Sequence, residues 1–300
     1  MDVSIIIVSY NTCSLTLNCL KSVFEQTKAV DFEVIVSDNG SKDGSVEKIK
    51  QEYPQVVLIE NNANLGFGAA NNRGLKVAKG KYILYLNNDT ILLNNAVKIF
   101  FDYWENTTEK ERIGALGANL LNENGEVVHS YGVFPKPIKE ILLLSTRLVI
   151  TFSLCIFNRK RRNNKKIVNQ KYIGLVDYLT GADLFIKNNQ SALFDERFFL
   201  YYEETFLQKQ LEKRGLNRIM IDGPQIVHLE GQCNSKKEDC TVSRYMSFSD
   251  IQNELSRIKY QKYTGRVFVA FVMKVLLCLF WAIPCFYQET KMYRKELWSI

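Results

Sequence analysis

The sequence predicts an α/β protein whose central sheet is largely parallel, because strand and helix patterns alternate along its first third. The stretch from Val3 to Val8 is apolar apart from Ser4, a pattern typical of a strand buried on both faces. Polar turns rich in Asn, Asp, Ser and Gly separate the patterns. Of the 300 residues, 46% are hydrophobic and 24% are charged, which is a globular composition with enough apolar material for a large core.

The elements that follow keep this alternation, and helices between successive strands predict right-handed crossovers. Apolar residues from Leu15 to Phe24 recur at approximately helical spacing, and Phe32 to Ser37 has the pattern of a second buried strand. The remaining predicted elements are helices over Ser45 to Tyr53 and Ala69 to Ala78, and strands over Val56 to Glu60 and Tyr82 to Leu86.

Polar residues stand just past the predicted strand ends, at Asn11, Asp38, Asn64 and Asp89. Open α/β sheets bind ligands at the edge formed by the carboxyl ends of their strands. Asn, Asp and Gly also favour turns whatever the function, so a single such residue indicates no more than a turn. Their recurrence at one sheet edge favours a binding site.

Two apolar segments distinguish the middle and the end of the chain. Ile141 to Phe157 is apolar except for Ser, Thr and Arg147, and the basic stretch Arg159 to Lys166 follows directly. Val267 to Tyr287 is apolar except for Lys274. A charge is costly at the centre of a bilayer, so three readings stay open: helices lying at a membrane interface beside anionic lipid, buried core helices, or membrane spans.

The predicted organisation is a globular domain over residues 1–265, with an apolar and basic insert over about 138–170, and a membrane-associated helical tail over 266–300. The net charge is +7, and much of it lies in the basic stretch. Seven cysteines without CxxC pairs, Cys233 and Cys240 included, favour a reduced compartment over a zinc site. The chain opens on a strand pattern rather than a signal peptide, so we expect the domain in the cytoplasm.

Several side chains suit a site that handles a nucleotide and a metal ion. The Asp38 carboxylate can accept from a base or a ribose, Asp89 suits Mg²⁺ or Mn²⁺, and His228 suits a metal or a phosphate. Glu203 and Glu204 follow an aromatic run, and such surroundings raise a carboxyl pKa toward the range of a general base. Each has an ordinary alternative as a solvated acid, a favourable charge at a helix N-terminus or a structural histidine.

An ordered set of motifs carries more weight than any one residue. In chain order they are Ser4–Asn11, Val36–Ser45, Asn64–Gly74, Leu86–Asp89, Thr180–Asp183, Phe194–Glu204 and His228–Gly231. This set resembles glycosyltransferase family 2, in particular its rhamnosyltransferase-like branch, over about residues 2 to 265. The resemblance implies a GT-A fold, with a mostly parallel central sheet flanked by helices and here a C-terminal apolar helical extension.

The resemblance also implies a role for each matching position. The implied nucleotide-sugar-binding residues are Tyr10, Asn11 and Asp38 at the nucleoside, Asn64, Asn72 and Arg73 near the diphosphate and sugar, Asn88, and Gly181, Ala182 and Asp183 at the sugar-side or acceptor-side wall. Asp89 and His228 are the implied ligands of a divalent cation, Mg²⁺ or Mn²⁺. Glu204 falls at the position of the catalytic base, with Glu203 as the fallback.

Three positions depart from the family pattern. Asn87 replaces the first acid of the metal motif, so metal binding rests on Asp89. Glu204 stands where Asp is usual, which lengthens the side chain by a methylene and keeps the acid. Phe206 stands where the branch commonly has a second Asp, which puts the contact made by that acid in doubt.

The resemblance implies an inverting glycosyltransferase that moves a sugar from a nucleotide diphosphate to a hydroxyl of a lipid-linked saccharide in the synthesis of O-antigen, capsule or another cell-surface polysaccharide. It favours dTDP-rhamnose as the donor, with UDP-hexoses open. We expect work at the cytoplasmic face of the cell membrane, held peripherally or by the C-terminal helix, with a homodimer open.

Other classes fit less well. A nucleotidyltransferase needs a Gly-rich loop with basic residues near its N-terminus, and a dinucleotide-binding oxidoreductase needs GxGxxG after the first strand, where this chain has Ser9-Tyr10-Asn11-Thr12. Nucleic-acid binding is not expected, because one basic stretch beside an apolar segment suits anionic lipid better. A non-catalytic, membrane-associated nucleotide-sugar-binding subunit stays the alternative, and Phe206 gives it some support.

Overall fold

The computed structural model describes residues 1–157, 170–189, 192–229, 247–283 and 290–300. It divides the chain into two compact units. The sheet unit comprises Met1–Phe134, Ile167–Glu196 and Glu203–Ser235, and the helical unit comprises Pro135–Lys166, Arg197–Tyr202 and Lys236–Ile300. This division differs from the predicted boundary at residue 265, because the predicted insert and the last helices belong to one unit.

Some sequence expectations concern residues outside these described ranges. They are the basic stretch Arg159–Lys166, the cysteines Cys233 and Cys240, and the end of the second apolar segment beyond residue 283.

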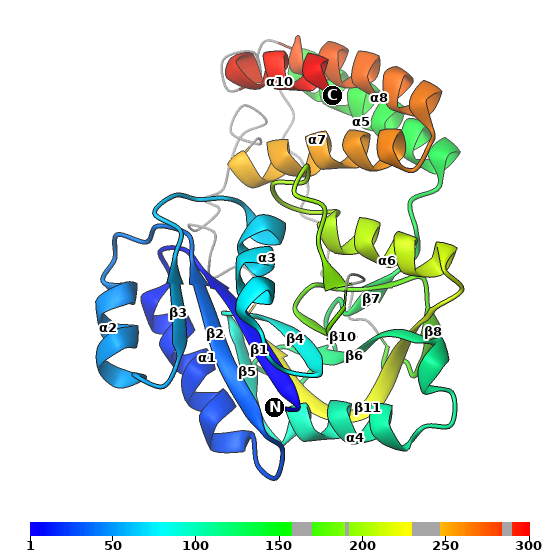
Figure 1. The fold of residues 1–300 in the computed structure, drawn as a ribbon. Helices are drawn as coiled ribbons and strands as arrows, with labels where there is room; N and C mark the ends of the chain where they lie inside the picture. Colours follow the sequence, from blue (N-terminus) through cyan, green and yellow to red (C-terminus); the bar gives the residue numbers. More distant parts are fainter. Residues whose placement is uncertain (158–169, 190–191, 230–246, 284–289) are drawn as a thin grey trace. The chain divides into compact units, whose positions relative to one another are not determined.

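The sheet unit contains most of the strands (Figure 1). Its strands are β1 (Val3–Ser9), β2 (Phe32–Asp38), β3 (Val57–Glu60), β4 (Tyr82–Asn87), β5 (Thr90–Leu92), β6 (Ile113–Leu121), β7 (Tyr131–Gly132), β8 (Gly174–Val176), β9 (Tyr178–Leu179), β10 (Asp183–Lys187) and β11 (Asn217–His228). Its helices are α1 (Cys13–Gln26), α2 (Ser45–Glu52), α3 (Phe67–Val77), α4 (Ala96–Asn106), the 3₁₀ turn η1 (Lys110–Arg112) and α6 (Glu203–Lys213).

The main sheet runs in the order β3-β2-β1-β4-β10-β6-β11-β5, with β8 beside β11. Strands β3, β2, β1 and β4 are mutually parallel, and β6 is parallel to β11, whereas β10 runs antiparallel to β4 and β6. In the register, Ser9 pairs with Asp38 and Val8 pairs with Asn87, so these strands end level with one another. The predicted α/β architecture with a mostly parallel sheet is confirmed.

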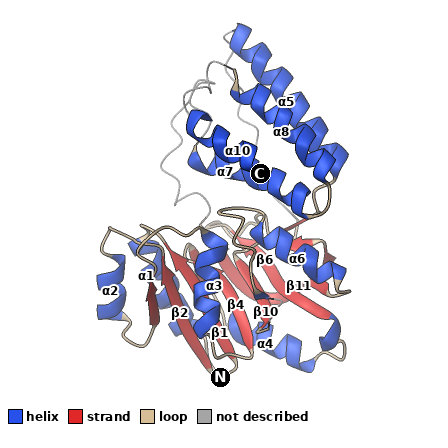
Figure 2. Cartoon of the chain, turned by 45° about the horizontal axis from the view of Figure 1, so that its top comes forward, coloured by secondary structure: helices blue, strands red, loops and turns tan. Residues whose placement is uncertain are grey.

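Alternate residues of the strands pack into two separate cores. Ile5 and Ile7 of β1 face α1, α2 and α4, whereas Ile6 faces the core that α3 and α6 help to build. Figure 2 shows α3 and α6 on one face of the sheet. On that face Gly74 lets α3 approach β1, because a Cβ at Gly74 would lie 2.5 Å from Cγ2 of Ile6.

The helical unit consists of α5 (Pro137–Phe157), α7 (Phe248–Tyr263), α8 (Val267–Trp281), the 3₁₀ turn η4 (Lys291–Tyr293) and α10 (Arg294–Ser299). Ser247 and Asp250 form a capping box at the start of α7. The helices share one apolar core, to which α7 contributes Leu255 and α8 contributes Leu277 and Trp281. The second apolar segment is therefore partly a core helix, and α8 ends at Trp281.

Ion pairs accompany that core. Arg257 donates to Glu140 of α5 at 2.6 Å and to Glu254 of its own helix at 3.1 Å, and Arg147 also pairs with Glu254. Burial lowers the guanidinium pKa of Arg257, but the charges of Glu254 and Glu140 outweigh this effect and leave the pKa raised. The first apolar segment thus uses its one arginine within the unit.

Apolar side chains also lie on the outside of this unit. On α5 and α8 the exposed ones are Ile138, Leu142, Leu143, Val149, Ile150, Phe152, Val267, Phe268, Phe271, Val275 and Leu279. Within the described part of the chain, none of the helices combines the length and the apolar character that crossing a membrane requires.

Candidate active site

Pairing at the carboxyl ends of the strands gathers several of the predicted residues. Asp183 begins β10 opposite Leu86 of β4, and the amide of Asn87 donates to the carbonyl of Ala182 at 3.0 Å. His228 ends β11 opposite Thr90 of β5. The motifs at Asn87–Asp89, Thr180–Asp183 and His228 therefore meet, although they are far apart in the sequence.

The centre of this group is the contact between Asp89 and His228. Oδ1 of Asp89 lies 3.2 Å from Nε2 of His228, and Nδ2 of Asn87 lies 3.4 Å from the same nitrogen. The side chains of Asp89 and His228 are 9% and 14% exposed, so the pair is largely shielded yet not sealed from solvent. A carboxylate and an imidazole that converge in this way suit a cation that a ligand helps to coordinate.

Asp183 supplies a second, fully buried carboxyl beside the first. Its Oδ2 accepts the amide of Ala118 at 2.7 Å, and its Oδ1 has no hydrogen-bond partner among the described residues. Burial raises the pKa of Asp183 to about 7, against the lowering effects of the Ala118 amide and of His228. Asp183 can therefore change protonation near neutral pH.

The predicted nucleoside end is a pair of interlocked turns. The Asp38 carboxylate accepts from the amides of Gly40 and Ser41 at 2.9 and 2.8 Å and from the Ser41 hydroxyl at 2.6 Å. Asn11, in the left-handed region at φ 52°, accepts the amide of Lys42 at 2.8 Å. Tyr10 is exposed beside it. The carboxylate of Asp38 thus shapes its own turn, and its contact to a nucleoside stays a prediction.

Two of the amides predicted to bind the nucleotide sugar, those of Asn64 and Asn88, hold local structure. Asn64 accepts the amide of Gly66 at 3.0 Å, and Asn88 donates to the hydroxyls of Thr12 and Thr16 at the start of α1. Their roles toward a ligand stay predictions.

The remaining predicted pair lies on α3. Asn72 is buried and exchanges hydrogen bonds of 2.9 Å with the backbone of Phe194 and one of 3.0 Å with Glu196. Its carboxamide therefore ties α3 to the segment before α6. Arg73 is exposed on the same helix.

Glu203 and Glu204 open α6 and point to different neighbours. Glu203 is buried, its Oε2 has no partner among the described residues, and a Cβ at Gly68 would lie 3.5 Å from its own Cβ. Glu204 is half-buried, and a Cβ at Gly181 would lie 3.7 Å from its Cβ. Glu204 is thus the acid beside the Gly181–Asp183 segment.

Burial raises the pKa of both glutamates, and in Glu203 the charge of Glu204 adds to this effect. Tyr201 and Tyr202, which precede them, both have left-handed φ values of 67°, a strained turn for residues with side chains. The backbone of this turn determines the direction in which the side chains of Glu203 and Glu204 point.

The donor set fits a divalent cation that is shared with a substrate. Among the described residues no group of three or more His, Cys, Asp or Glu side chains converges on a metal position. Mg²⁺ sites often use one or two protein ligands together with substrate phosphates. Asp89 and His228 supply two donors, and Asn87 adds a buried Oδ1 without a partner in the described chain. The residues present therefore fit such a group.

Sequence reasoning missed the residues that hold this site together. Gln208 of α6 accepts the amide of Leu179 and donates to its carbonyl, each at 2.8 Å, and so ties the helix of the acids to β9. The only sequence signal for Gln208 was its position one turn after Glu204. Phe206, which stands where the family pattern has a second Asp, is buried in the sheet unit.

Comparison with known proteins agrees with this geometry. A family model described as glycosyl transferase family 2 matches residues 4–160, which is just over half of the chain. The matched range includes the turns after β1, β2 and β4 but stops before Asp183, Glu204 and His228.

Individual relatives share the same region. A poly(ribitol-phosphate) β-glucosyltransferase of Bacillus spizizenii is 31% identical over 50% of this chain, which spans 24% of that protein. An N-acetylglucosaminyl-diphospho-decaprenol L-rhamnosyltransferase of Mycobacterium tuberculosis is 25% identical over 65% of this chain and 66% of its own length. The mannosyltransferase of Pyrobaculum calidifontis, solved with GDP-Man and Mn²⁺, has a TM-score of 0.54 at 14% identity over 97% of this chain and 74% of its own.

Proposed function

The chain belongs to glycosyltransferase family 2, and we propose that it transfers a sugar from a nucleotide diphosphate donor to a hydroxyl of a lipid-linked saccharide. The observation that carries the proposal is the approach of Asp89 to His228 at the carboxyl edge of the sheet. The ionisable pair Glu203–Glu204 and the buried acid Asp183 belong to the same unit.

On the donor side, Asp89 and His228 hold the divalent cation that the diphosphate requires. When bound, this cation, Mg²⁺ or Mn²⁺, neutralises the charge of the leaving nucleoside diphosphate. The Mn²⁺ in the mannosyltransferase structure supports a cation of this kind here. Asn87 orients His228 through its amide, and the turns at Asn11 and Asp38 receive the nucleoside.

On the acceptor side, Glu204 takes the proton of the attacking hydroxyl. Its raised pKa makes the carboxylate a stronger base than a solvated glutamate, and its place beside Gly181 supports an acceptor against that wall. Direct attack on the anomeric carbon inverts its configuration. Most of the rate enhancement then comes from positioning the reactants and from stabilising the leaving group.

The identities of the donor sugar and of the acceptor are the most specific parts of the proposal. The mycobacterial relative is named for rhamnosyl transfer to a diphospho-decaprenol lipid, which supports dTDP-rhamnose and a lipid-linked saccharide here. The Bacillus relative is named for glucosyl transfer to poly(ribitol-phosphate), which keeps UDP-glucose open and supports a role in cell-surface polysaccharide synthesis.

Exposed side chains of the helical unit support a contact with a membrane surface, for which we propose the cytoplasmic face. Phe268 and Phe271 on α8 are 76% and 55% exposed, and Phe152 on α5 is 56% exposed. Apolar and aromatic side chains exposed on helices suit insertion at the depth of lipid headgroups. Such a contact would hold the enzyme where a lipid-linked acceptor resides.

Thermal stability in the presence of donors tests the proposal first, because a ligand that binds the native state raises the melting temperature. The panel holds dTDP-rhamnose, UDP-glucose, UDP-GlcNAc and GDP-mannose, each with Mn²⁺ or with EDTA. We expect Mn²⁺-dependent stabilisation by one donor, dTDP-rhamnose first. Stabilisation by another donor changes the substrate and keeps the class. No stabilisation by any of them counts against the proposed function and against the nucleotide-sugar-binding alternative.

A further inference from the structure

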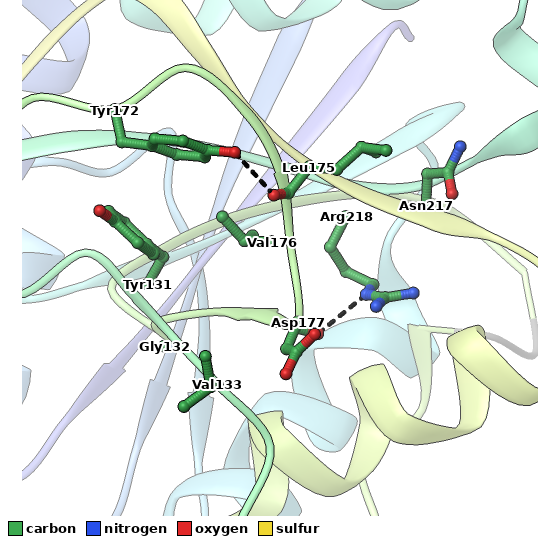
Figure 3. A pocket seen from close by; sticks show the side chains of 9 residues that line it. All are labelled: Tyr131, Gly132, Val133, Tyr172, Leu175, Val176, Asp177, Asn217 and Arg218. Atoms are coloured by element: carbon green, nitrogen blue, oxygen red, sulfur yellow. Dashed lines mark hydrogen bonds between the residues drawn. The ribbon is translucent and has the colours of Figure 1, made fainter.

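A separate pocket of about 360 Å³ lies in the sheet unit, formed by residues that the proposed transfer does not use (Figure 3). Its lining residues are Tyr131, Gly132, Val133, Tyr172, Leu175, Val176, Asp177, Asn217 and Arg218. Pockets that bind small molecules usually begin at about 300 Å³, so one or two sugar-sized units would fit.

One side of the pocket is aromatic and held in place. The rings of Tyr131 and Tyr172 lie 5.2 Å apart between centroids and are tilted by 36°. The backbone of Tyr172 exchanges hydrogen bonds of 2.8 and 2.9 Å with Asn119 of β6, and its hydroxyl donates to Leu175 at 3.1 Å. The ring is therefore positioned before any ligand arrives, although Tyr172 is 40% exposed.

The other side is polar. Figure 3 shows Arg218 and Asn217 opposite the two tyrosines. Arg218 is only 8% exposed and donates to the carbonyls of Asp177 and Leu216 at 2.9 and 2.6 Å, but no ion pair of Arg218 is found within the described chain. Oδ2 of the Asp177 carboxylate accepts the amide of Phe134 at 2.8 Å, and Asp177 is one of the residues that line the pocket.

This combination matches the surface of a pyranose sugar. A sugar presents patches of C–H groups that pack on aromatic rings, and hydroxyls that both donate and accept. Tyr131 and Tyr172 offer the rings, Asp177 offers an acceptor, and Arg218 with Asn217 offers donors. The carboxylate offsets the guanidinium, so the pocket favours a neutral sugar over a phosphate.

We propose that this pocket is a saccharide-binding subsite that receives a sugar unit of the acceptor, some way from the hydroxyl that reacts. The inference rests on the proposed function for the identity of the ligand as part of an acceptor.

Chain continuity supports its connection to the acceptor side. Asp177 lies four residues before Gly181, the residue beside Glu204, and a fully extended chain of that length spans at most about 14 Å. Strand β9 between them pairs with β7, whose Tyr131 and Gly132 line the pocket. A saccharide of a few units can therefore reach from the pocket to the base.

The test uses ligand-observed NMR on the full chain with separate methyl glycosides of glucose, galactose, mannose, rhamnose and N-acetylglucosamine. We expect saturation transfer to at least one glycoside, and a dissociation constant about tenfold weaker in Tyr172→Ala, the loss expected for one aromatic contact. Tyr103→Ala is the matched control, because Tyr103 is 39% exposed on α4 and lines a different hollow. Asn217→Ala is a second variant, should Tyr172→Ala fold poorly.

Adding UDP and Mn²⁺ separates this proposal from the proposed function. Binding that persists with UDP and weakens in Tyr172→Ala or Asn217→Ala supports the subsite, even if every donor fails to stabilise the protein. Three results would overturn the subsite: no saturation transfer to any glycoside, equal binding of the glycoside by both pocket variants and wild type, or displacement of the glycoside by UDP. Displacement would assign the glycoside to the donor site.

Discussion

Among individual residues, the carboxylate of Asp89 and the imidazole of His228 come from strand ends far apart in the sequence, yet Oδ1 of Asp89 lies 3.2 Å from Nε2 of His228. Substitution of either residue would remove one of the two ionisable ligands of the proposed cation site. Turn chemistry alone would explain Asp89, but it does not explain why the histidine of β11 meets it.

We expect Asp89→Ala to lower the rate of sugar transfer at least about 100-fold, because the diphosphate loses a group that positions its charge. Release of nucleoside diphosphate in the presence of acceptor measures this rate. Asp102→Ala is the matched control, since Asp102 is an acid of α4 that pairs with Lys98. Near-normal turnover of the Asp89 variant would remove its proposed role.

For the pair on α6, we expect Glu204→Gln to bind donor normally and to lose about 100-fold or more in transfer, the contribution of a general base. In wild type the rate should rise with pH through a pKa above that of an ordinary glutamate, because burial raises the pKa and the base must be ionised. Glu203→Gln is the comparison. If it loses activity while Glu204→Gln keeps it, the base is Glu203.

Asp183 gives a pH dependence of stability. Its pKa is raised from 3.8 to about 7, so the folded protein holds a proton that the unfolded chain releases. This contribution is fully present below about pH 4 and is lost as pH rises through about 7, up to roughly 4 kcal/mol. In metal-free buffer, urea unfolding of Asp183→Asn should lack this decline. An identical pH slope in both proteins contradicts the assignment.

Among the elements, the first four strands and the helices between them could be predicted from sequence within a few residues. Each strand is a short, mainly apolar run followed by Asn, Asp or Gly, and the helices between them carry apolar residues at helical spacing. Strands β5, β8 and β9 could not, since each has only two or three residues and takes its shape from pairing with distant strands. The pocket could not be predicted from the sequence for the same reason. Its residues come from β7, β8, the start of β11 and the loops beside them, and no spacing in the sequence links Tyr131 to Arg218.

The sequence likewise predicted only part of the candidate site. The motifs predicted Asp89, Glu204 and His228, whose surroundings fit their proposed roles. Asn72 could not be separated from them by sequence, although the structure shows its carboxamide bonded to Phe194 and Glu196. An amide that shapes a loop and one that faces a ligand look alike until their partners are known.

Within the helical unit, we expect Arg257→Ala to destabilise the unit by about 3–5 kcal/mol, the usual cost of removing one partner of a buried ion pair. Glu140, 14% exposed, would lose its partner, whereas Glu254 would keep Arg147. Hydrogen exchange in α7 measures the change. Lys259→Ala is the control, because its partner Glu296 is 38% exposed. Similar exchange in both variants would show that the Arg257 pair adds nothing.

In the molecule as a whole, helix α8 has both a buried and an exposed side. Met273, Leu277 and Trp281 lie in the core of the helical unit, while Phe268 and Phe271 are exposed. The two alternatives of core helix and interface helix are therefore compatible in one element. Deletion and surface substitution of α8 test them separately.

Truncation before Val267 should unfold what remains of the helical unit, because each buried large side chain that is lost contributes about 1.5–3 kcal/mol. We expect loss of slow hydrogen exchange in α7 and retention of it in β1 and β4 of the sheet unit. Retained protection of α7 would mean that α8 is dispensable for the core.

Phe268→Ser together with Phe271→Ser should keep the melting temperature and weaken binding to vesicles that contain anionic lipid, about tenfold or more, since both rings are exposed. Co-sedimentation with vesicles measures this, and Tyr103→Ser on α4 is the control. Unchanged sedimentation would count against the membrane proposal.

The interleaving of the two units affects how the protein is made. Helix α5 is complete at residue 157, but α8, the helix against which it packs, starts only at residue 267. At about 5–20 residues per second, α5 waits roughly 5–20 s for that partner. During this interval its apolar side chains, those of the future core included, have no α8 to cover them. We therefore expect a nascent chain with such a helix to bind either a chaperone or a lipid surface before translation ends.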